Sequence, residues 1–136
     1  MFWEGASCIC LHEGKLLMVL QGTPEEEKRW SVPSGGKETG ETFEECCIRE
    51  VWEETGYFVK IKEKLHIKEG ISLGIHFKVQ YFLGEVVSGS LKIQDPDGLI
   101  YDIRWVSFEE LKHLTLSFPE DRELLMNYLA PFADII

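Results

Sequence analysis

Three glutamates near the middle of the chain have the residue type and spacing of a metal-binding site. Glu50, Glu53 and Glu54 are three and four positions apart, so in a helix of 3.6 residues per turn they share one face. Like charges at this spacing destabilise a helix, and the helix dipole disfavours anions in its last turn. A hard divalent cation with oxygen ligands would relieve both penalties. Ordinary solvated acidic faces carry the same pattern, so the wider sequence must decide between the two interpretations.

The element that positions these carboxylates is predicted as a helix over residues 43–55. Thr42 and Glu45 have the S/T-x-x-E spacing of a capping box, and Gly56 stands where a left-handed residue ends a helix. At 100° per residue, the side of this helix away from the glutamates carries the residues that we expect to be buried, which are Ile48, Val51, Trp52 and Thr55.

The wider spacing is that of a known motif: the chain reads Gly35-x5-Glu41-x7-Arg49-Glu50-Val51-x-Glu53-Glu54-x-Gly56-Tyr57. This stretch resembles the Nudix box, G-x5-E-x7-R-E-U-x-E-E-x-G-U, in which U is an aliphatic residue. Every fixed position matches; of the two U positions, Val51 fits and Tyr57 departs. Because so many spaced positions rarely match by chance, the chain is identified as a member of the Nudix hydrolase family.

This resemblance implies the Nudix α/β/α sandwich with a mixed β-sheet, and the rest of the chain agrees with this α/β (α+β) class. Apolar runs at 5–12 and 15–21, separated by Glu13-Gly14, predict a hairpin, and further strands are expected at 58–62, 65–68, 75–81 and 100–106. Ser107 opens a short helix through Leu111, and Pro119 begins an amphipathic one whose apolar residues are Leu124, Leu125, Tyr128, Leu129 and Phe132. With 136 residues and no linker, we expect a single Nudix domain over 1–136.

The resemblance also implies a role for each residue of the glutamate cluster. Glu50, Glu53 and Glu54 would bind Mg²⁺ (or Mn²⁺), and in some members the residue equivalent to Glu50 acts instead as the general base. Arg49, one helical turn from Glu53, would orient a carboxylate through a charge-assisted hydrogen bond. The backbone carbonyl of Ser34, just before the box glycine, is a further implied metal ligand.

Other candidate site residues lie outside the helix. Asp97, in the loop where some members supply another acid, is the candidate for an additional metal ligand, with Asp102 as its rival. Trp30 either stacks on a substrate base or anchors its loop as a buried aromatic residue. Lys37 and Arg29 are candidates for contact with substrate phosphates.

The function that the resemblance implies is a Mg²⁺-dependent pyrophosphohydrolase that cleaves the diphosphate linkage of a nucleoside diphosphate joined to a group X. Two alternatives remain: an RNA 5′-end pyrophosphohydrolase and a non-catalytic nucleotide-binding module. The formal charge of −10 disfavours nucleic-acid partners, because phosphate backbones are bound through Lys and Arg. The intact glutamate set disfavours the non-catalytic module. A small nucleotide bound through a cation suits an acidic protein.

Composition and cysteine spacing predict where the protein works. No apolar run approaches the roughly 20 residues of a membrane helix, and the N-terminal residues MFWEGASC lack the basic and apolar regions of a signal peptide. The four cysteines lack the Cys-x2-Cys spacing of zinc sites and are interpreted as small buried residues in a reducing compartment, namely Cys8, Cys10, Cys46 and Cys47. We therefore expect a cytoplasmic protein without a membrane partner; no oligomeric state is indicated.

Overall fold

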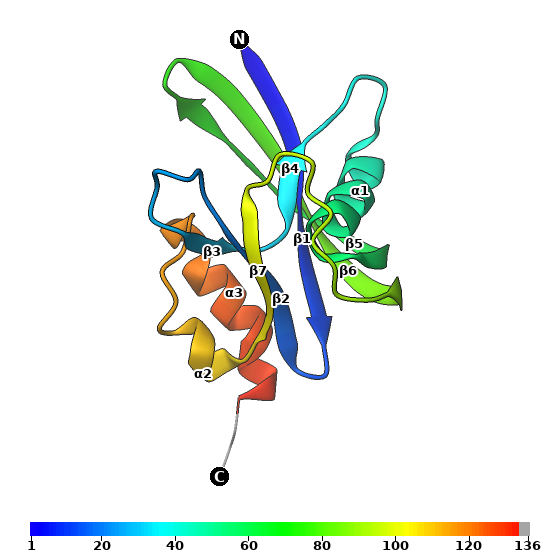
Figure 1. Cartoon of the computed structure of the whole chain (residues 1–136), viewed down its shortest axis with the longest axis vertical. Coiled ribbons are helices and arrows are strands. Elements are labelled where there is room, and N and C mark those ends of the chain that lie inside the picture. Colours follow the sequence, from blue (N-terminus) through cyan, green and yellow to red (C-terminus); the bar gives the residue numbers. More distant parts are fainter. Residues whose placement is uncertain (134–136) are drawn as a thin grey trace.

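One mixed sheet stands between two helical layers in the computed structural model, which describes residues 1–133 (Figure 1). The strands are β1 (Phe2–His12), β2 (Lys15–Gln21), β3 (Arg29–Ser31), β4 (Ser34–Gly36), β5 (Tyr57–Ser72), β6 (Ile75–Gly89) and β7 (Ile100–Val106). The helices are α1 (Phe43–Thr55), α2 (Phe108–Leu111) and α3 (Arg122–Leu129), with 3₁₀ turns η1 (Pro119–Asp121) and η2 (Ala130–Phe132). The predicted α/β/α sandwich is confirmed, with α1 on one side of the sheet and α2 and α3 on the other.

Strand β1 is the centre of the sheet because it pairs along both of its edges. One edge runs parallel to β6, from Phe2 opposite His76 onward. The other edge is shared: β4 pairs antiparallel with the first half of β1, where Ser7 lies opposite Ser34, and β2 pairs with its end. The order is β3-β2-β1-β6-β5, with β7 on β2. The short strand β4 is thereby fixed beside the middle of the sheet.

Alternation along the central strands builds a separate apolar core on each face of the sheet. Ile9 of β1 points toward the α3 side, whereas its neighbours Cys8 and Cys10 point toward α1. The core under α1 consists of Ala6, Cys8, Cys10, Leu17, Cys46, Cys47, Val51, Val59 and Phe82. Helix α1 therefore lies on a packed base, which holds its other faces in a defined orientation.

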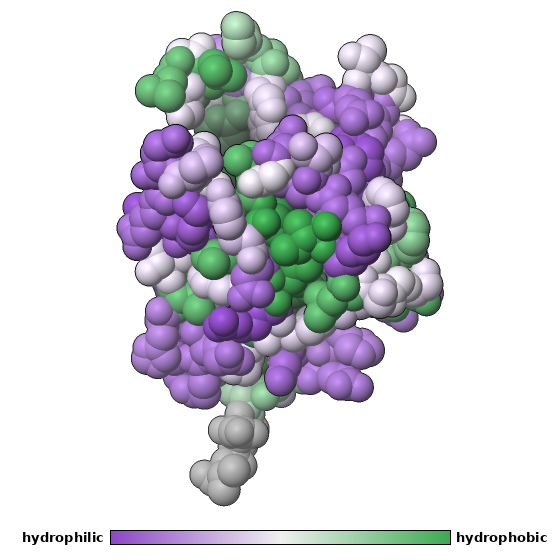
Figure 2. All heavy atoms as spheres, viewed as in Figure 1, coloured by the Kyte–Doolittle hydropathy of each residue, from purple (hydrophilic) through white to green (hydrophobic). Residues whose placement is uncertain are grey.

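The observed elements differ from the predicted ones mainly in length. Strand β5 is unbroken where two short strands were predicted, because bulges at Phe58–Val59, Ile61–Glu63 and Lys64–Ile67 absorb irregular pairing with β6. The last helix ends at Leu129, and Phe132 lies exposed in η2, since Pro131 cannot continue an α-helix. Figure 2 shows hydrophobic side chains at the end of the molecule where the β5–β6 hairpin and the N-terminus lie. No helix within residues 1–133 is long and apolar enough to span a membrane.

Candidate active site

Helix α1 has the predicted ends. The Thr42 side-chain oxygen accepts the Glu45 N–H at 3.0 Å, and the Glu45 carboxylate accepts the Thr42 N–H at 2.9 Å, which completes the capping box. Gly56 has φ 83° and donates its N–H to the Trp52 carbonyl. Beyond that, the segment after β6 satisfies two more carbonyls of the last turn, through Lys92 N–H to Thr55 and Gln94 N–H to Glu53. All three glutamates of the cluster thus lie on a helix whose N- and C-termini are both capped.

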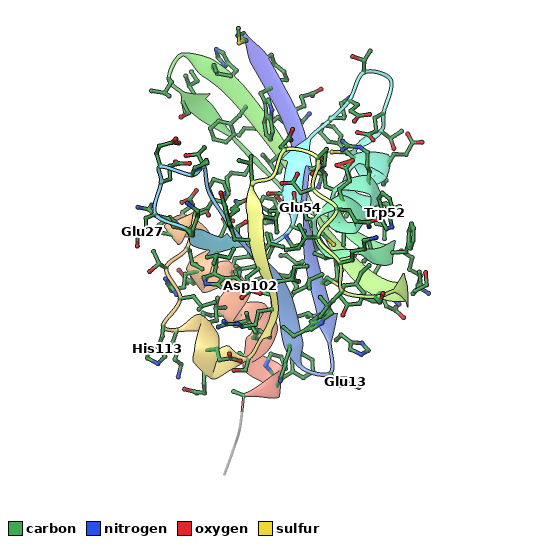
Figure 3. The ribbon with its side chains drawn as sticks, viewed as in Figure 1. Glu13, Glu27, Trp52, Glu54, Asp102 and His113 are labelled. Atoms are coloured by element: carbon green, nitrogen blue, oxygen red, sulfur yellow. The ribbon has the colours of Figure 1, made fainter. Side chains whose placement is uncertain are left out.

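Glu50 and Glu54 bring two carboxyl groups together against β4. Glu54 is only 5% exposed and accepts the Ser34 N–H at 3.3 Å (Figure 3). Burial, and then the charge of Glu50, raise the pKa of Glu54 well above its ordinary value, with a smaller contribution from Asp95. Burial also raises the pKa of Glu50, whose carboxyl group lies beside that of Glu54. Without a cation, burial and mutual repulsion both disfavour two charged carboxylates at this place.

Gly35 leaves the space that Glu50 occupies. A Cβ atom built on Gly35 would overlap the carboxyl carbon and Oε2 of Glu50 and lie 2.6 Å from its Oε1. Gly35 does not have positive φ, so the glycine is needed for close approach and not for backbone conformation. The box glycine and Glu50 are therefore parts of one arrangement.

Arg49 connects the carboxylates of the motif to one another. Its Nε and Nη2 bind the two oxygens of Glu41 at 2.7 and 2.9 Å, and its Nη1 binds Glu50 Oε1 at 2.7 Å. The Gly36 carbonyl accepts from Nη2 at 2.8 Å, and Glu53 lies 3.3 Å from Nη1. The guanidinium holds the pKa of Glu41 below its usual range. Arg49 thus orients Glu50 and Glu53 in the way that the sequence predicts.

The donor set fits a hard divalent cation in its chemistry. Glu54 is a buried oxygen donor and Glu50 a partly buried one, and a cation would remove their mutual repulsion, since such cations prefer carboxylate oxygens. Glu53 faces Arg49, and within residues 1–133 no three His, Cys, Asp or Glu side chains are arranged to hold a metal ion. Two of the three predicted ligands are therefore together, and the third is held beside them by the arginine.

The loop before β7 carries the predicted acid, Asp97, and a second acid, Asp95. Asp97 is exposed in the turn, and its N–H donates to Asp95 Oδ1 at 3.2 Å. Asp95 Oδ2 accepts the Leu99 N–H, and its charge is the one that acts on Glu54. Asp102 is exposed on β7, 3.7 Å from Arg104. Asp95 is thus the loop acid whose charge raises the pKa of Glu54, and Asp97 stays a candidate metal ligand.

Each of the three predicted substrate contacts interacts with another side chain of the protein. Trp30 is 8% exposed in the core on the α3 side, with the Arg104 guanidinium 4.9 Å from its ring centre, so it anchors its strand and offers no free face for a base. Lys37 lies 3.5 Å from Glu4. Arg29 is exposed beside a hollow at the β2–β3 loop, 3.7 Å from Glu27.

Sequence reasoning missed a second polar cluster, on the α3 side of the sheet. Tyr81 donates its hydroxyl hydrogen to Asp121 Oδ2 at 2.6 Å, and Lys68 Nζ lies 2.9 Å from Asp121 Oδ1. Asp121 is 7% exposed. These residues come from β5, β6 and η1, and no spacing along the chain signals that they meet.

This α/β/α fold, in which helix α1 carries the glutamates and packs against the glycine-containing strand β4, is the fold of Nudix hydrolases. A solved NUDIX hydrolase from Nitrosomonas europaea has a TM-score of 0.83 to it, at 23% identity, over 96% of this chain and 90% of that one. The NUDIX domain family model matches residues 1–128. The chain therefore belongs to the Nudix hydrolase family, as the box predicts.

Two curated relatives are similar over most of this chain. "Phosphatase NudJ" of Escherichia coli is 30% identical over 105 residues, covering 77% of this chain and 68% of that protein. "Putative nudix hydrolase 1" of Caenorhabditis elegans is 31% identical over 113 residues, covering 81% of this chain. The match spans only 30% of the length of the nematode protein.

Proposed function

We propose that this protein hydrolyses the diphosphate linkage of nucleoside diphosphate derivatives by metal-assisted attack of water. The carrying observation is the pair of a buried Glu54 and a partly buried Glu50, of which Glu50 lies against the box glycine and is oriented by Arg49. A buried carboxyl group next to a partly buried one destabilises the fold, and a bound cation would offset this cost. Family membership and the similarity to a protein named as a phosphatase support phosphate chemistry.

The chain's own residues have distinct parts in this reaction. Glu53 and Glu54 would hold Mg²⁺ or Mn²⁺, and Glu50 would either join them or act as the general base. The cation supplies charge neutralisation at the phosphate oxygens and a lowered pKa for bound water. As the base, Glu50 would accept the proton of the attacking water on Oε2, the oxygen that Arg49 does not contact. Arg49 keeps Glu50 and Glu53 in place during the attack.

The net charge of −10 supports a small anionic substrate that is bound through cations. A panel of nucleoside diphosphate sugars, dinucleotides, nucleoside triphosphates and a 5′-triphosphorylated RNA oligonucleotide, assayed for phosphate-containing products, tests this proposal. We expect turnover of a nucleoside diphosphate derivative with Mg²⁺ or Mn²⁺ and none in excess EDTA.

Matched variants separate a catalytic cluster from a solvated acidic face. Glu53→Gln and Glu54→Gln are expected to lower kcat by roughly 100-fold or more, whereas Glu44→Gln, an exposed acid in the first turn of the same helix, is expected to leave kcat unchanged. Full activity in EDTA, or wild-type rates in both site variants, would overturn the proposal. Turnover of the RNA alone would favour the RNA 5′-end alternative.

A further inference from the structure

Leu73 stands at the tip of the β5–β6 hairpin, where both the backbone and the surroundings disfavour a leucine. It is 98% exposed, and its φ of 52°, followed by 77° at Gly74, has the pattern of a type I′ turn. Such turns favour Asn-Gly, and a bulky residue at positive φ is strained. The β1–β2 hairpin has the same pattern, with φ of 50° and 76°, but carries the charged Glu13 at this place. The turn therefore gains nothing from a leucine, which points to a contact outside this chain.

The leucine belongs to an exposed apolar patch at this end of the molecule, which we call the hairpin patch and which consists of Met1, Phe2, Ile71 and Leu73. The side chains of the first three are 62–91% exposed. Figure 1 shows the β5–β6 hairpin and the start of β1 extending beyond the helices, and Figure 2 shows hydrophobic atoms at that end. Exposed apolar patches of this kind are typical of protein–protein contacts.

A hollow of about 300 Å³ lies directly beside the tip. Its apolar rim comes from Phe2 and Ile71, which flank His76 at one position of the sheet ladder. Its charged rim comes from the opposed pair Glu69 and Lys78, two positions further along β5 and β6. Because side chains two positions apart on a strand point to the same face, all five lie on one face of the sheet. This end of the molecule therefore carries both a protruding leucine and a hollow large enough to receive one.

The charges at this end suit the approach of a second acidic copy. The chain as a whole has 14 basic and 24 acidic side chains, so two copies repel each other. Strands β5 and β6 differ from the rest, because they carry five lysines and only three glutamates. At the hollow, an exposed Glu69 lies opposite Lys78. When two such faces meet about a two-fold axis, each charge can face one of opposite sign.

We propose that the hairpin patch and the hollow beside it are the interface of a homodimer. The two copies are related by a two-fold axis, and Leu73 of each copy lies in the hollow of the other. A symmetric interface requires that one surface hold both complementary features, and the tip and the hollow meet this requirement. Glu69 of each copy then faces Lys78 of the other. Burial of the leucines and of the apolar side chains around them offsets the strain of the turn.

Sedimentation equilibrium tests this interface. The wild-type chain is expected to dimerise with a Kd of roughly 1–100 µM, because the patch is small. Leu73→Asn introduces the residue that the turn favours, so the variant folds. It should nevertheless raise Kd by roughly 100-fold or more, because two leucine side chains leave the interface. Glu13→Asn is the matched control: it makes the same change in the same type of turn at the other hairpin and should leave Kd unchanged.

Charge reversal gives a second test of the same arrangement. Lys78→Glu and Glu69→Lys should each raise Kd by roughly 10-fold, and the double variant should return it to near the wild-type value. A double variant that dimerises no better than the single ones would overturn the facing of Glu69 and Lys78.

Three results would overturn the homodimer itself. The first is a wild-type chain that stays monomeric up to roughly 1 mM, which is the result expected if the leucine contacts a different protein. The second is a Leu73→Asn variant with the wild-type Kd. The third is an equal rise in Kd for Leu73→Asn and Glu13→Asn, because the change would then not come from the hairpin patch.

Discussion

Replacing Gly35 with alanine tests the arrangement of β4 and Glu50 directly. The new methyl group would overlap the Glu50 carboxylate, which has no room to stay where it is. The backbone tolerates alanine, because Gly35 does not have positive φ. The methyl group should therefore displace one carboxylate and leave the sheet intact.

The magnitude follows from the contacts that would be lost. The 2.7 Å bond from Arg49 to Glu50 is charge-assisted and largely buried, so losing it costs about 1.5–3 kcal/mol. Replacing glycine reduces the entropy of the unfolded chain and returns about 0.4–1 kcal/mol. The net destabilisation is roughly 1–2 kcal/mol, or a fall in Tm of roughly 3–10 °C. The turnover rate should fall far more, by roughly 100-fold, because Glu50 is the proposed proton acceptor.

Thermal unfolding and a Mg²⁺ titration of the hydrolysis rate measure the two effects. Gly36→Ala is the matched control: it lies on the same strand, but its Cβ atom would meet the Trp3 indole at 3.2 Å and not Glu50. We expect the control to keep its Mg²⁺ midpoint within about threefold of wild type. A Gly35→Ala enzyme with normal rate and normal Mg²⁺ midpoint would show that Glu50 is not needed where the structure places it.

Three further outcomes are expected. Glu54→Gln should raise the Tm of the metal-free protein, because it removes a buried charge beside another carboxylate, and should lower kcat by roughly 100-fold, because it removes a proposed metal ligand. A lower Tm in differential scanning calorimetry would contradict this. Tyr81→Phe should destabilise the protein by roughly 1–2 kcal/mol near neutral pH, because Asp121 loses a hydrogen bond. Burial, and then Asp121, raise the pKa of Tyr81 from 10.0 to about 12, so the stabilisation is present below pH 10 and is lost as the pH rises through about 12. Urea unfolding of both proteins between pH 8 and 12 should show this difference shrinking. Asp95→Asn should raise the Mg²⁺ midpoint severalfold and Asp97→Asn should not, and the opposite order would restore Asp97 as the loop ligand.

Local signals explain which parts of the fold were predictable. The capping box at Thr42, the glycine at Gly56 and the hairpin at Glu13-Gly14 each use chemistry confined to a few neighbouring residues, and each appears where the sequence predicts it. The full length of β5 was not predictable in this way. Its pairing with β6 continues through bulges, and these depend on the partner strand and not on local alternation.

In the candidate site too, features set by neighbouring residues were predictable and features set by distant residues were not. Helical periodicity predicts correctly that Arg49 meets Glu53, because both are on one helix. It does not predict that Glu54 is buried, because the burial comes from β4, twenty residues earlier in the chain. Trp30 could be either an anchor or a stacking face in sequence alone, and only the packing on the α3 side makes it an anchor.

The cysteines beneath α1 give the site helix a built-in reporter of its own opening. Cys8, Cys10, Cys46 and Cys47 are at most 1% exposed, and burial raises the pKa of Cys10 to about 12. Since a thiol reacts as its thiolate, alkylating reagents should reach these sulfurs only in molecules where the helix has transiently left the sheet. The rate of alkylation would then measure how often the site helix undocks, with no label or substitution introduced.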